Sequence, residues 1–246
     1  MKILAVVPAR FASTRLPGKP LLADTGKPLI VHVLEAARRS SLIERVIVAT
    51  DDERILHAVH SHGGEAVMTR ADHPSGTDRV AEVAEQFLEA QIIVNLQGDE
   101  PEISGEALDR VVHLLQADAK LPMATLATPI LDPAILDDPA CVKVVFDLHG
   151  RALYFSRCPI PHHRDGRPQP QPGQPILGHL HLGLYAYRRD FLLSLAQLPP
   201  SRLEQTEKLE QLRVLEAGHP IGVGVVSERT IGIDTPDEYR AFVERF

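Results

Sequence analysis

Three cationic side chains stand close together near the start of the chain. Arg10, Arg15 and Lys19 fall within ten positions, in a segment, residues 6–22, that also holds Gly18 and three prolines. Guanidinium groups match phosphate oxygens, a lysine is a mobile point charge, and glycine lets backbone N–H groups approach an anion. The segment therefore predicts a loop that binds a polyphosphate. It has the spacing of neither common phosphate-binding motif, G-x-x-x-x-G-K-[ST] or G-x-G-x-x-G. The alternative is a solvated basic loop, because charge runs usually face water.

Two carboxylates stand in short motifs further along the chain. Asp99 lies in N-L-Q-G-D-E-P after the apolar run at 92–96, and Asp234 lies in G-I-D-T-P just before a helix start. Magnesium prefers hard oxygen ligands and commonly takes one or two carboxylates together with substrate phosphates. Thr235 fits the helix cap, which leaves Asp234 available for a metal. The two acids predict a Mg²⁺ site; the alternatives are a strand-ending turn with solvated acids and an ordinary helix-start residue.

A third motif, H-P-S-G-T-D-R at 73–79, leads into a helical pattern. Backbone N–H groups at a helix N-terminus, together with Ser75, would bind a base or an anion, and Arg70 just upstream would add a donor. The same residues also suit an ordinary capped helix.

Polar residues in the second half of the chain fit a hydroxylated, acidic ligand. Arg157 would clamp a carboxylate through two hydrogen bonds, or it is a surface arginine. His181 and Tyr185 alternate onto one strand face, where they would bind a polyol or fill a half-buried sheet. Glu210 and Gln211, on a predicted helix, would bind hydroxyl groups or face solvent.

The first 127 residues alternate between strand and helix patterns. The predicted strands are 3–7, 45–49, 65–68, 92–96 and 123–127, and the predicted helices are 28–39, 52–62, 77–89 and 104–116. This alternation is typical of a parallel sheet covered on both faces. Ligands of such sheets lie beyond the carboxyl ends of the strands. The polar motifs that follow 3–7, 45–49 and 92–96 are therefore expected to converge on one crevice.

The remainder of the chain follows another pattern. Strand patterns at 142–147 and 152–155 flank H-G at 149–150 and predict a hairpin, and six prolines and three glycines at 159–178 predict a long irregular loop. A strand at 179–187, a helix at 206–217 and a strand at 221–226 follow. T-P-D-E at 235–238 is a capping box that opens a C-terminal helix.

Composition bounds the class of protein. The 246 residues fit one large α/β domain, or one domain with an insertion. The net charge of −7 argues against a nucleic-acid-binding protein, so the cationic loop suggests a small anionic ligand. The two cysteines lack zinc-like spacing, and no apolar run approaches the length of a membrane span. A cytoplasmic protein with reduced thiols and no membrane insertion is expected.

Taken together, the motifs resemble the 3-deoxy-manno-octulosonate cytidylyltransferases, or CMP-Kdo synthetases, nearly from end to end. The matching segments are V-P-A-R-F-A-S-T-R-L-P-G-K-P-L at 7–21, V-A-T-D at 48–51, M-T-R-A-D-H at 68–73, S-G-T-D-R at 75–79, N-L-Q-G-D-E-P at 95–101, Y-F-S-R at 154–157, H-L-G at 181–183, L-E-Q-L-R at 209–213 and G-I-D-T-P at 232–236. Many nucleotidyltransferases share the opening loop. Its combination with Q-G-D-E-P and L-E-Q-L-R is specific for the Kdo branch.

The resemblance implies a Rossmann-like nucleotidyltransferase fold with a mixed, mostly parallel sheet, helices on both faces and a smaller hairpin-containing dimerisation region. Residues 1–246 would form a single domain, with a nucleotide-binding core at 1–130 and 200–246 and a sugar-binding and dimerisation region at about 131–199. The positions implied for CTP are Ala9, Arg10, Lys19, Arg70, Ser75 and Gly76. The positions implied for Kdo are Arg15, Gln97, Arg157, His181, Tyr185, Glu210 and Gln211. Asp99 and Asp234 match the family's Mg²⁺ ligands, and the implied catalytic group is Arg10, Arg15, Lys19, Asp99 and Asp234.

The implied reaction transfers CMP from CTP to the anomeric hydroxyl of Kdo, releasing pyrophosphate and supplying lipopolysaccharide biosynthesis, in a homodimeric enzyme. The residues suit this chemistry, because in-line attack on the α-phosphorus needs positioning and charge neutralisation rather than a covalent nucleophile. The alternatives are a cytidylyltransferase for 8-amino-Kdo or sialic acid, and a nucleotide sensor without turnover.

Overall fold

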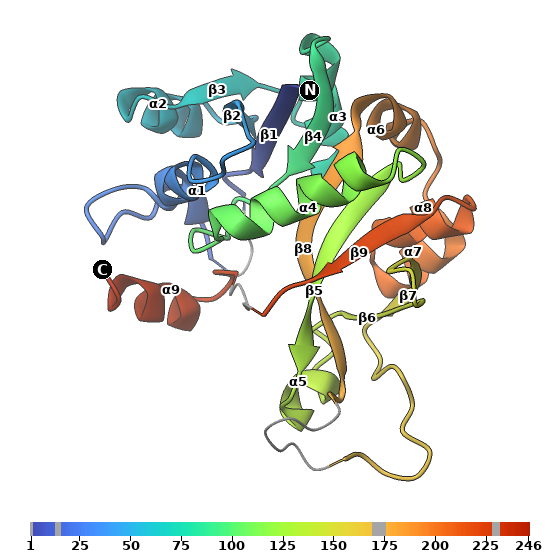
Figure 1. Cartoon of the computed structure of the whole chain (residues 1–246). Coiled ribbons are helices and arrows are strands. Elements are labelled where there is room, and N and C mark those ends of the chain that lie inside the picture. Colours follow the sequence, from blue (N-terminus) through green and yellow to red (C-terminus); the bar gives the residue numbers. More distant parts are fainter. Residues whose placement is uncertain (1, 13–15, 169–175, 228–231) are drawn as a thin grey trace.

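The computed structural model describes residues 2–12, 16–168, 176–227 and 232–246. Its described strands form one nine-stranded mixed sheet (Figure 1). The main path runs β3 (Glu65–Met68), β2 (Arg45–Thr50), β1 (Lys2–Ala9), β4 (Ala90–Asn95), β8 (Gly178–Arg188), β5 (Met123–Ile130) and β9 (Ile221–Val225). A hairpin of β6 (Lys143–Phe146) and β7 (Ala152–Ser156) joins the sheet where β6 pairs with β8.

The pairing confirms the predicted parallel arrangement of the first five strands, with one addition. Strands β3, β2, β1 and β4 are parallel neighbours. β8 lies between β4 and β5 and is antiparallel to both, so β5 still runs in the same direction as β4. Part of the region from 131 to 199 therefore belongs to the central sheet. β5 and β8 continue together beyond the other strands, toward α5 (Pro133–Asp137) (Figure 1).

Helices cover both faces of the sheet, as predicted. Alternate residues of β1 point to opposite faces, so Val7 packs with α1 (Leu29–Ala37), α2 (Glu53–Ser61) and α4 (Gly105–Ala117). Val6 packs on the other face, with α3 (Gly76–Gln86), α6 (Arg189–Ala196) and α8 (Gln211–Glu216). Both clusters exclude water, and this burial is the main force that holds the sheet.

The C-terminal helix α9 (Pro236–Val243) packs on a smaller cluster near the opening loop. Tyr239 and Phe242 of α9 contact Leu16 and Leu29, on either side of the 3-10 turn η1 (Lys19–Leu21). The predicted capping box is present, with Thr235 as the cap residue. This packing brings the segment before α9 next to the opening loop, although the two are far apart in sequence.

The predicted continuous helix at 206–217 is wrong. The chain forms α7 (Arg202–Glu207) and α8, separated at Lys208, whose φ of 55° lies in the left-handed region. Arg157 donates to the backbone oxygens of Glu207 and Lys208 at this break, so long-range bonds replace bonds of a continuous helix. The helices α5 and α6 were also not among the predicted elements. Among the described residues, no helix has both the length and the apolarity that a membrane crossing requires.

Candidate active site

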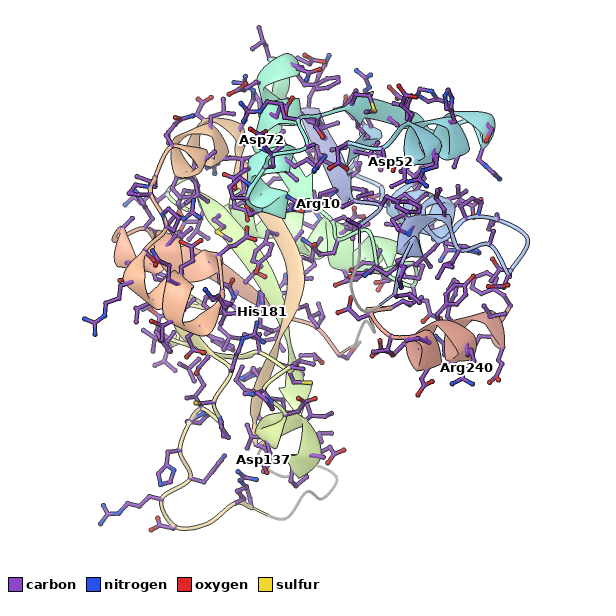
Figure 2. The ribbon with its side chains drawn as sticks, turned by 180° about the vertical axis from the view of Figure 1, so that it is seen from behind. Arg10, Asp52, Asp72, Asp137, His181 and Arg240 are labelled. Carbon is purple, nitrogen blue, oxygen red and sulfur yellow. The ribbon has the colours of Figure 1, made fainter. Side chains whose placement is uncertain are left out.

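A cleft of about 680 Å³ opens beyond the carboxyl end of β4, beside β8 and α8. Its lining gathers predicted site residues from distant parts of the chain: Gly76, Gln97, Asp99, Arg157, His181, Tyr185, Glu210, Gln211 and Asp234. Figure 2 shows His181 on β8 and Arg10 beyond the end of β1. Arg15 lies outside the described residues. Of the three motifs expected to converge here, the one after 92–96 lines the cleft, and the opening loop reaches it through Lys19, which bonds to Asp99. The motif after 45–49 is not part of the described lining, because β1 separates β2 from β4, and its Asp51 pairs with Arg79 instead.

Lys19 joins the opening loop to both predicted metal ligands. Its Nζ lies 2.8 Å from Asp99 Oδ2 and 2.9 Å from Asp234 Oδ1. Burial disfavours the ammonium ion, but the two carboxylates outweigh burial and raise the pKa of Lys19 above its ordinary value. Burial raises the pKa of Asp99, and Lys19 opposes that shift. One cation thus holds two carboxylates together at the wall of the cleft.

The donor set around Lys19 fits a divalent cation. Two carboxylate oxygens that both bond to one nitrogen are close enough to share one cation. Within the described ranges, no group of three or more histidine, cysteine or acidic side chains has the arrangement of a metal site. Further ligands would have to come from water and substrate, as is common for magnesium.

The nucleotide-side residues lie where β1 ends and α3 begins. Arg10 Nη2 donates to the backbone oxygens of His73 (2.6 Å) and Ser75 (3.3 Å). Ser75 caps α3, with its Oγ accepting from the backbone nitrogen of Asp78 at 3.2 Å. Gly76 is the first residue of the helix, and a Cβ there would lie 3.6 Å from Pro8. The loop before α3 is therefore fastened to the end of β1.

Of the predicted nucleotide positions, Gly76 lines this cleft, whereas the other five are not among its lining residues: Ala9, Arg10, Lys19, Arg70 and Ser75. Ala9, the last residue of β1, is buried beneath it. Arg70 has a side chain that is 70 % exposed and lies 3.6 Å from Asp72. Its role toward a nucleotide stays a prediction, because its guanidinium points to solvent rather than to a cleft residue.

On the sugar side, His181 is neutral and its tautomer can be assigned. The Thr125 hydroxyl has two backbone carbonyls within donating distance, Leu184 at 2.8 Å and Leu182 at 3.2 Å. Donation of its single proton to either one assigns His181 Nε2, at 3.0 Å, as a donor to the hydroxyl. His181 Nδ1 is then an acceptor. Burial lowers the pKa of His181 to about 3. Burial also raises the pKa of Tyr185 well above its ordinary value, so that this phenol keeps its proton. The pair offers uncharged hydrogen-bonding groups.

Gln211 presents a buried donor on the same side. Its side chain is 4 % exposed, and its Nε2 has no hydrogen-bond partner among the described residues. Glu210, its neighbour, accepts from Thr77 Oγ1 at 2.5 Å and so links α8 to the start of α3. A buried amide without a partner is costly, and a ligand hydroxyl in the cleft would satisfy it.

Arg157 makes contacts that its motif did not predict. Its guanidinium donates to the backbone oxygens of Glu207 (2.7 Å), Pro139 (3.0 Å) and Lys208 (3.4 Å). These bonds give Arg157 a structural role at the helix break. They leave only the remaining N–H groups of the guanidinium to bind a carboxylate.

Several cleft residues were not predicted from the sequence. Lys208 lies on an element whose boundaries were misplaced, so its position carried no signal. Asn95 did carry one, because it is a polar residue at the carboxyl end of a buried strand. Glu100 and Glu238 also line the cleft and stand inside predicted motifs, N-L-Q-G-D-E-P and the T-P-D-E capping box.

Comparisons with known proteins agree with this geometry. The family model described as Cytidylyltransferase matches residues 4–225. The 3-deoxy-manno-octulosonate cytidylyltransferase of Syntrophotalea carbinolica is 50% identical over 240 residues, which cover 97% of this chain and 96% of that protein. A solved CMP:2-keto-3-deoxy-manno-octonic acid synthetase complexed with CTP is 44% identical, with a TM-score of 0.92 over 100% of this chain and 98% of the other.

A more distant structure shows the fold alone. The 4-diphosphocytidyl-2C-methyl-D-erythritol synthase of Anaerococcus prevotii is 14% identical, with a TM-score of 0.63 over 99% of this chain and 95% of that one. The predicted α/β nucleotidyltransferase fold is confirmed. Given the matched family model and the near-complete alignment at half identity, this chain belongs to the cytidylyltransferase family, among the 3-deoxy-manno-octulosonate cytidylyltransferases.

Proposed function

We propose that this protein transfers CMP from CTP to the anomeric hydroxyl of 3-deoxy-manno-octulosonate and thereby supplies lipopolysaccharide biosynthesis. The observation that carries the proposal is the meeting of Lys19, Asp99 and Asp234 at the wall of a cleft with uncharged polar groups opposite. A new bond forms between the sugar oxygen and the α-phosphorus. The bond from that phosphorus to pyrophosphate breaks, and the hydroxyl proton is lost.

The chain's own residues supply binding and orientation for this transfer. Arg10 reaches the region between the end of β1 and the start of α3, and Lys19 lies at Asp99 and Asp234. Phosphate oxygens of CTP would bind near these two cations. Gln211 Nε2 and His181 Nδ1 offer one donor and one acceptor to sugar hydroxyls. Holding both substrates in line removes much of the entropic barrier to reaction.

We also propose that Asp99 and Asp234 hold Mg²⁺. The support is the pair of carboxylates that already share one cation. When bound, the metal would neutralise phosphate charge and lower the pKa of the attacking hydroxyl. Lys19 would then turn from the carboxylates toward the phosphates, because two cations cannot occupy the same space between the acids.

The test measures pyrophosphate release by the purified protein with CTP and Mg²⁺, with and without Kdo. Release that requires all three components is expected, and CTP should surpass the other nucleoside triphosphates. Parallel reactions with 8-amino-Kdo and with sialic acid in place of Kdo test whether the protein prefers one of these sugar acids. CTP binding without product from any sugar acid would instead identify a nucleotide sensor, and release without a sugar acid would also contradict the proposal.

The metal assignment needs its own variant. Asp99→Asn should lower kcat by roughly 10²-fold or more, because it removes charge next to the reacting phosphates. Asp237→Asn is the matched control, since Asp237 lies on α9 with an 83% exposed side chain paired to Arg240. Near-normal kcat for Asp99→Asn would overturn the assignment.

A further inference from the structure

A buried lysine lies directly behind one wall of the cleft. Lys143 is the first residue of β6 and has no exposed surface. Its Nζ donates to the backbone oxygens of Asp138 (2.9 Å), Cys141 (2.5 Å) and Arg157 (2.5 Å). Within the described part of the chain, no carboxylate pairs with it, and the Asp138 carboxylate instead accepts from Ala140 N at 2.8 Å. A buried ammonium ion bonded only to carbonyls is unusual, because buried lysines normally pair with an acid.

The three acceptors belong to two separate chain segments that both line the cleft. Asp138 and Cys141 precede β6, and Arg157 follows β7. The β6–β7 ladder ends at the pair Lys143–Ser156, so the ladder itself does not hold the two segments beyond that point. The ammonium ion bridges them there, together with the Arg157 guanidinium, which donates to the Pro139 oxygen at 3.0 Å. It therefore helps to set the spacing between residues 138–142 and Arg157.

The charge of Lys143 also matters, because the cleft is acidic. Among the described residues, six carboxylate residues line it: Asp99, Glu100, Asp138, Glu210, Asp234 and Glu238. Lys19 pairs with two of them, Asp99 and Asp234. The basic residues of the same described lining are Arg157, which is bonded to carbonyls, and Lys208, and His181 is neutral. A sugar acid is an anion and must bind within this field. A buried cation acts on it more strongly than a solvated one, because the surrounding dielectric constant is lower.

We propose that Lys143 is a positioning residue for the sugar acid: its ammonium ion fixes the wall formed by residues 138–142 and Arg157, and supplies positive charge behind that wall. This inference rests on the proposed function. Lys143 contacts no substrate, since its side chain is buried and its donors are taken by the backbone. Its effect should therefore fall on binding of the sugar acid and not on binding of CTP.

The protonation of Lys143 gives a second way to test its role. Burial lowers the pKa of Lys143, and nearby acidic groups oppose this shift. The titratable and charged groups near it are first Cys141, Asp138, Cys158 and Asp137. They also include Arg157, Glu207 of α7, which accepts from Ser156 at the end of β7, and His181, which follows the β8 residue opposite Lys143. Loss of its proton at alkaline pH would remove one donor and the charge, and would weaken binding of an anionic sugar.

The experiment compares Lys143→Met, which removes the charge at similar length, with Lys143→Arg, which keeps it. Lys143→Met should raise the KM for Kdo about tenfold and leave the KM for CTP within about twofold. Lys143→Arg should recover most of the loss. Lys120→Met, at an exposed turn, is the matched control. Equal changes in both KM values, or an unchanged KM for Kdo, would overturn the proposal.

If Lys143→Met does not fold, the KM for Kdo at alkaline pH tests the same role in proteins that keep a cation at this position. Between pH 8 and pH 10, the KM of the wild-type protein for Kdo should rise, and in Lys143→Arg this rise should be absent, because a guanidinium stays protonated. The same rise in both proteins would refute the role of Lys143. A wild-type protein that makes no product from CTP and Kdo would refute the proposed function instead, so the two failures are distinguishable.

Discussion

Lys19 Nζ lies 2.8 Å from Asp99 Oδ2, although the two residues are 80 positions apart. The same nitrogen lies 2.9 Å from Asp234 Oδ1. The lysine therefore lies between the two carboxylates that we propose as ligands of a divalent cation. Under that proposal, Lys19 and a metal would compete for the two acids without bound nucleotide, and the phosphates of CTP would offer the lysine an alternative partner.

This competition predicts that Lys19→Met binds divalent cations more tightly than the wild-type protein. We expect about tenfold tighter binding of Mn²⁺ in the absence of nucleotide, measured by calorimetry, because one competing charge is lost. Turnover should fall at the same time, since the phosphates lose a cation. Lys27→Met is the control, because Lys27 pairs with Glu35 outside the cleft. Unchanged Mn²⁺ affinity in Lys19→Met would show that the lysine does not compete.

Because His181 is buried in its neutral form, we expect the free energy of unfolding to depend on pH. Its pKa of about 3 in the folded protein lies below the ordinary value of 6.5, because burial disfavours the charged ring. The contribution of neutral His181 to the free energy of unfolding is therefore complete above pH 6.5. It is lost as the pH falls toward 3, because in this range the unfolded chain binds a proton and the folded chain does not. His181→Gln should remove this part of the acid sensitivity.

Unfolding in urea at pH 7 and pH 4.5 measures the effect. The loss of unfolding free energy between these two pH values should be about 1–2 kcal/mol smaller in His181→Gln than in wild type, a value reduced because the ring borders the open cleft. His149→Gln, at an exposed turn, should behave as wild type. Equal acid sensitivity in all three proteins would contradict the assigned burial.

Local sequence patterns predicted the strands and helices of the first half well, because period and capping are local properties. Residues 65–68 form β3 as predicted, and the capping boxes and strand ends follow directly from residue types. The order of the sheet was less accessible. The insertion of β8 between β4 and β5 depends on pairs such as Asn95 with Tyr185, which are 90 positions apart, and no local pattern records such pairing.

The same distinction applies to the site. Asp99 and Asp234 could be singled out as candidate ligands because Asp99 follows a predicted strand and Asp234 precedes a helix that Thr235 caps. Their shared contact with Lys19 depends on the packing of α9. The position of Lys143 could not be predicted. A lysine at a strand start normally faces solvent, and only the folded backbone carbonyls around it explain its burial.

The predicted homodimer remains untested, and the hairpin offers a way to examine it. Leu148 and Leu153 are 103% and 62% exposed on the hairpin formed by β6 and β7. If this surface joins two subunits, Leu148→Asp with Leu153→Asp should convert a dimer to a monomer in light scattering. Leu88→Asp, at a 77% exposed leucine elsewhere, is the control. A dimer that survives the double substitution would place the interface on another surface.

Replacing Lys208 by glycine should raise the stability of the fold and weaken binding of the sugar acid. Its φ of 55° is unfavourable for a side chain with a Cβ, and it lines the cleft at the break between α7 and α8. Lys208→Gly should stabilise the fold by about 0.5–1 kcal/mol, because glycine adopts this conformation without strain. Lys208→Ala removes the same side chain but keeps the strain, so it should show no such gain.

Both Lys208 variants lose the same cation from an acidic cleft, so both should show the same rise in the KM for Kdo. Comparing them separates the effect of the backbone from that of the charge. Urea unfolding measures the effect of the backbone on stability, and steady-state kinetics measure the effect of the charge on the KM for Kdo. If glycine and alanine have equal stability, the left-handed backbone is not strained, and the Arg157 bonds to Glu207 and Lys208 alone account for the break. If the KM values of the glycine and alanine variants differ, the backbone conformation between α7 and α8 affects the sugar site. Arg157, which bonds to this backbone, is then the next residue to substitute.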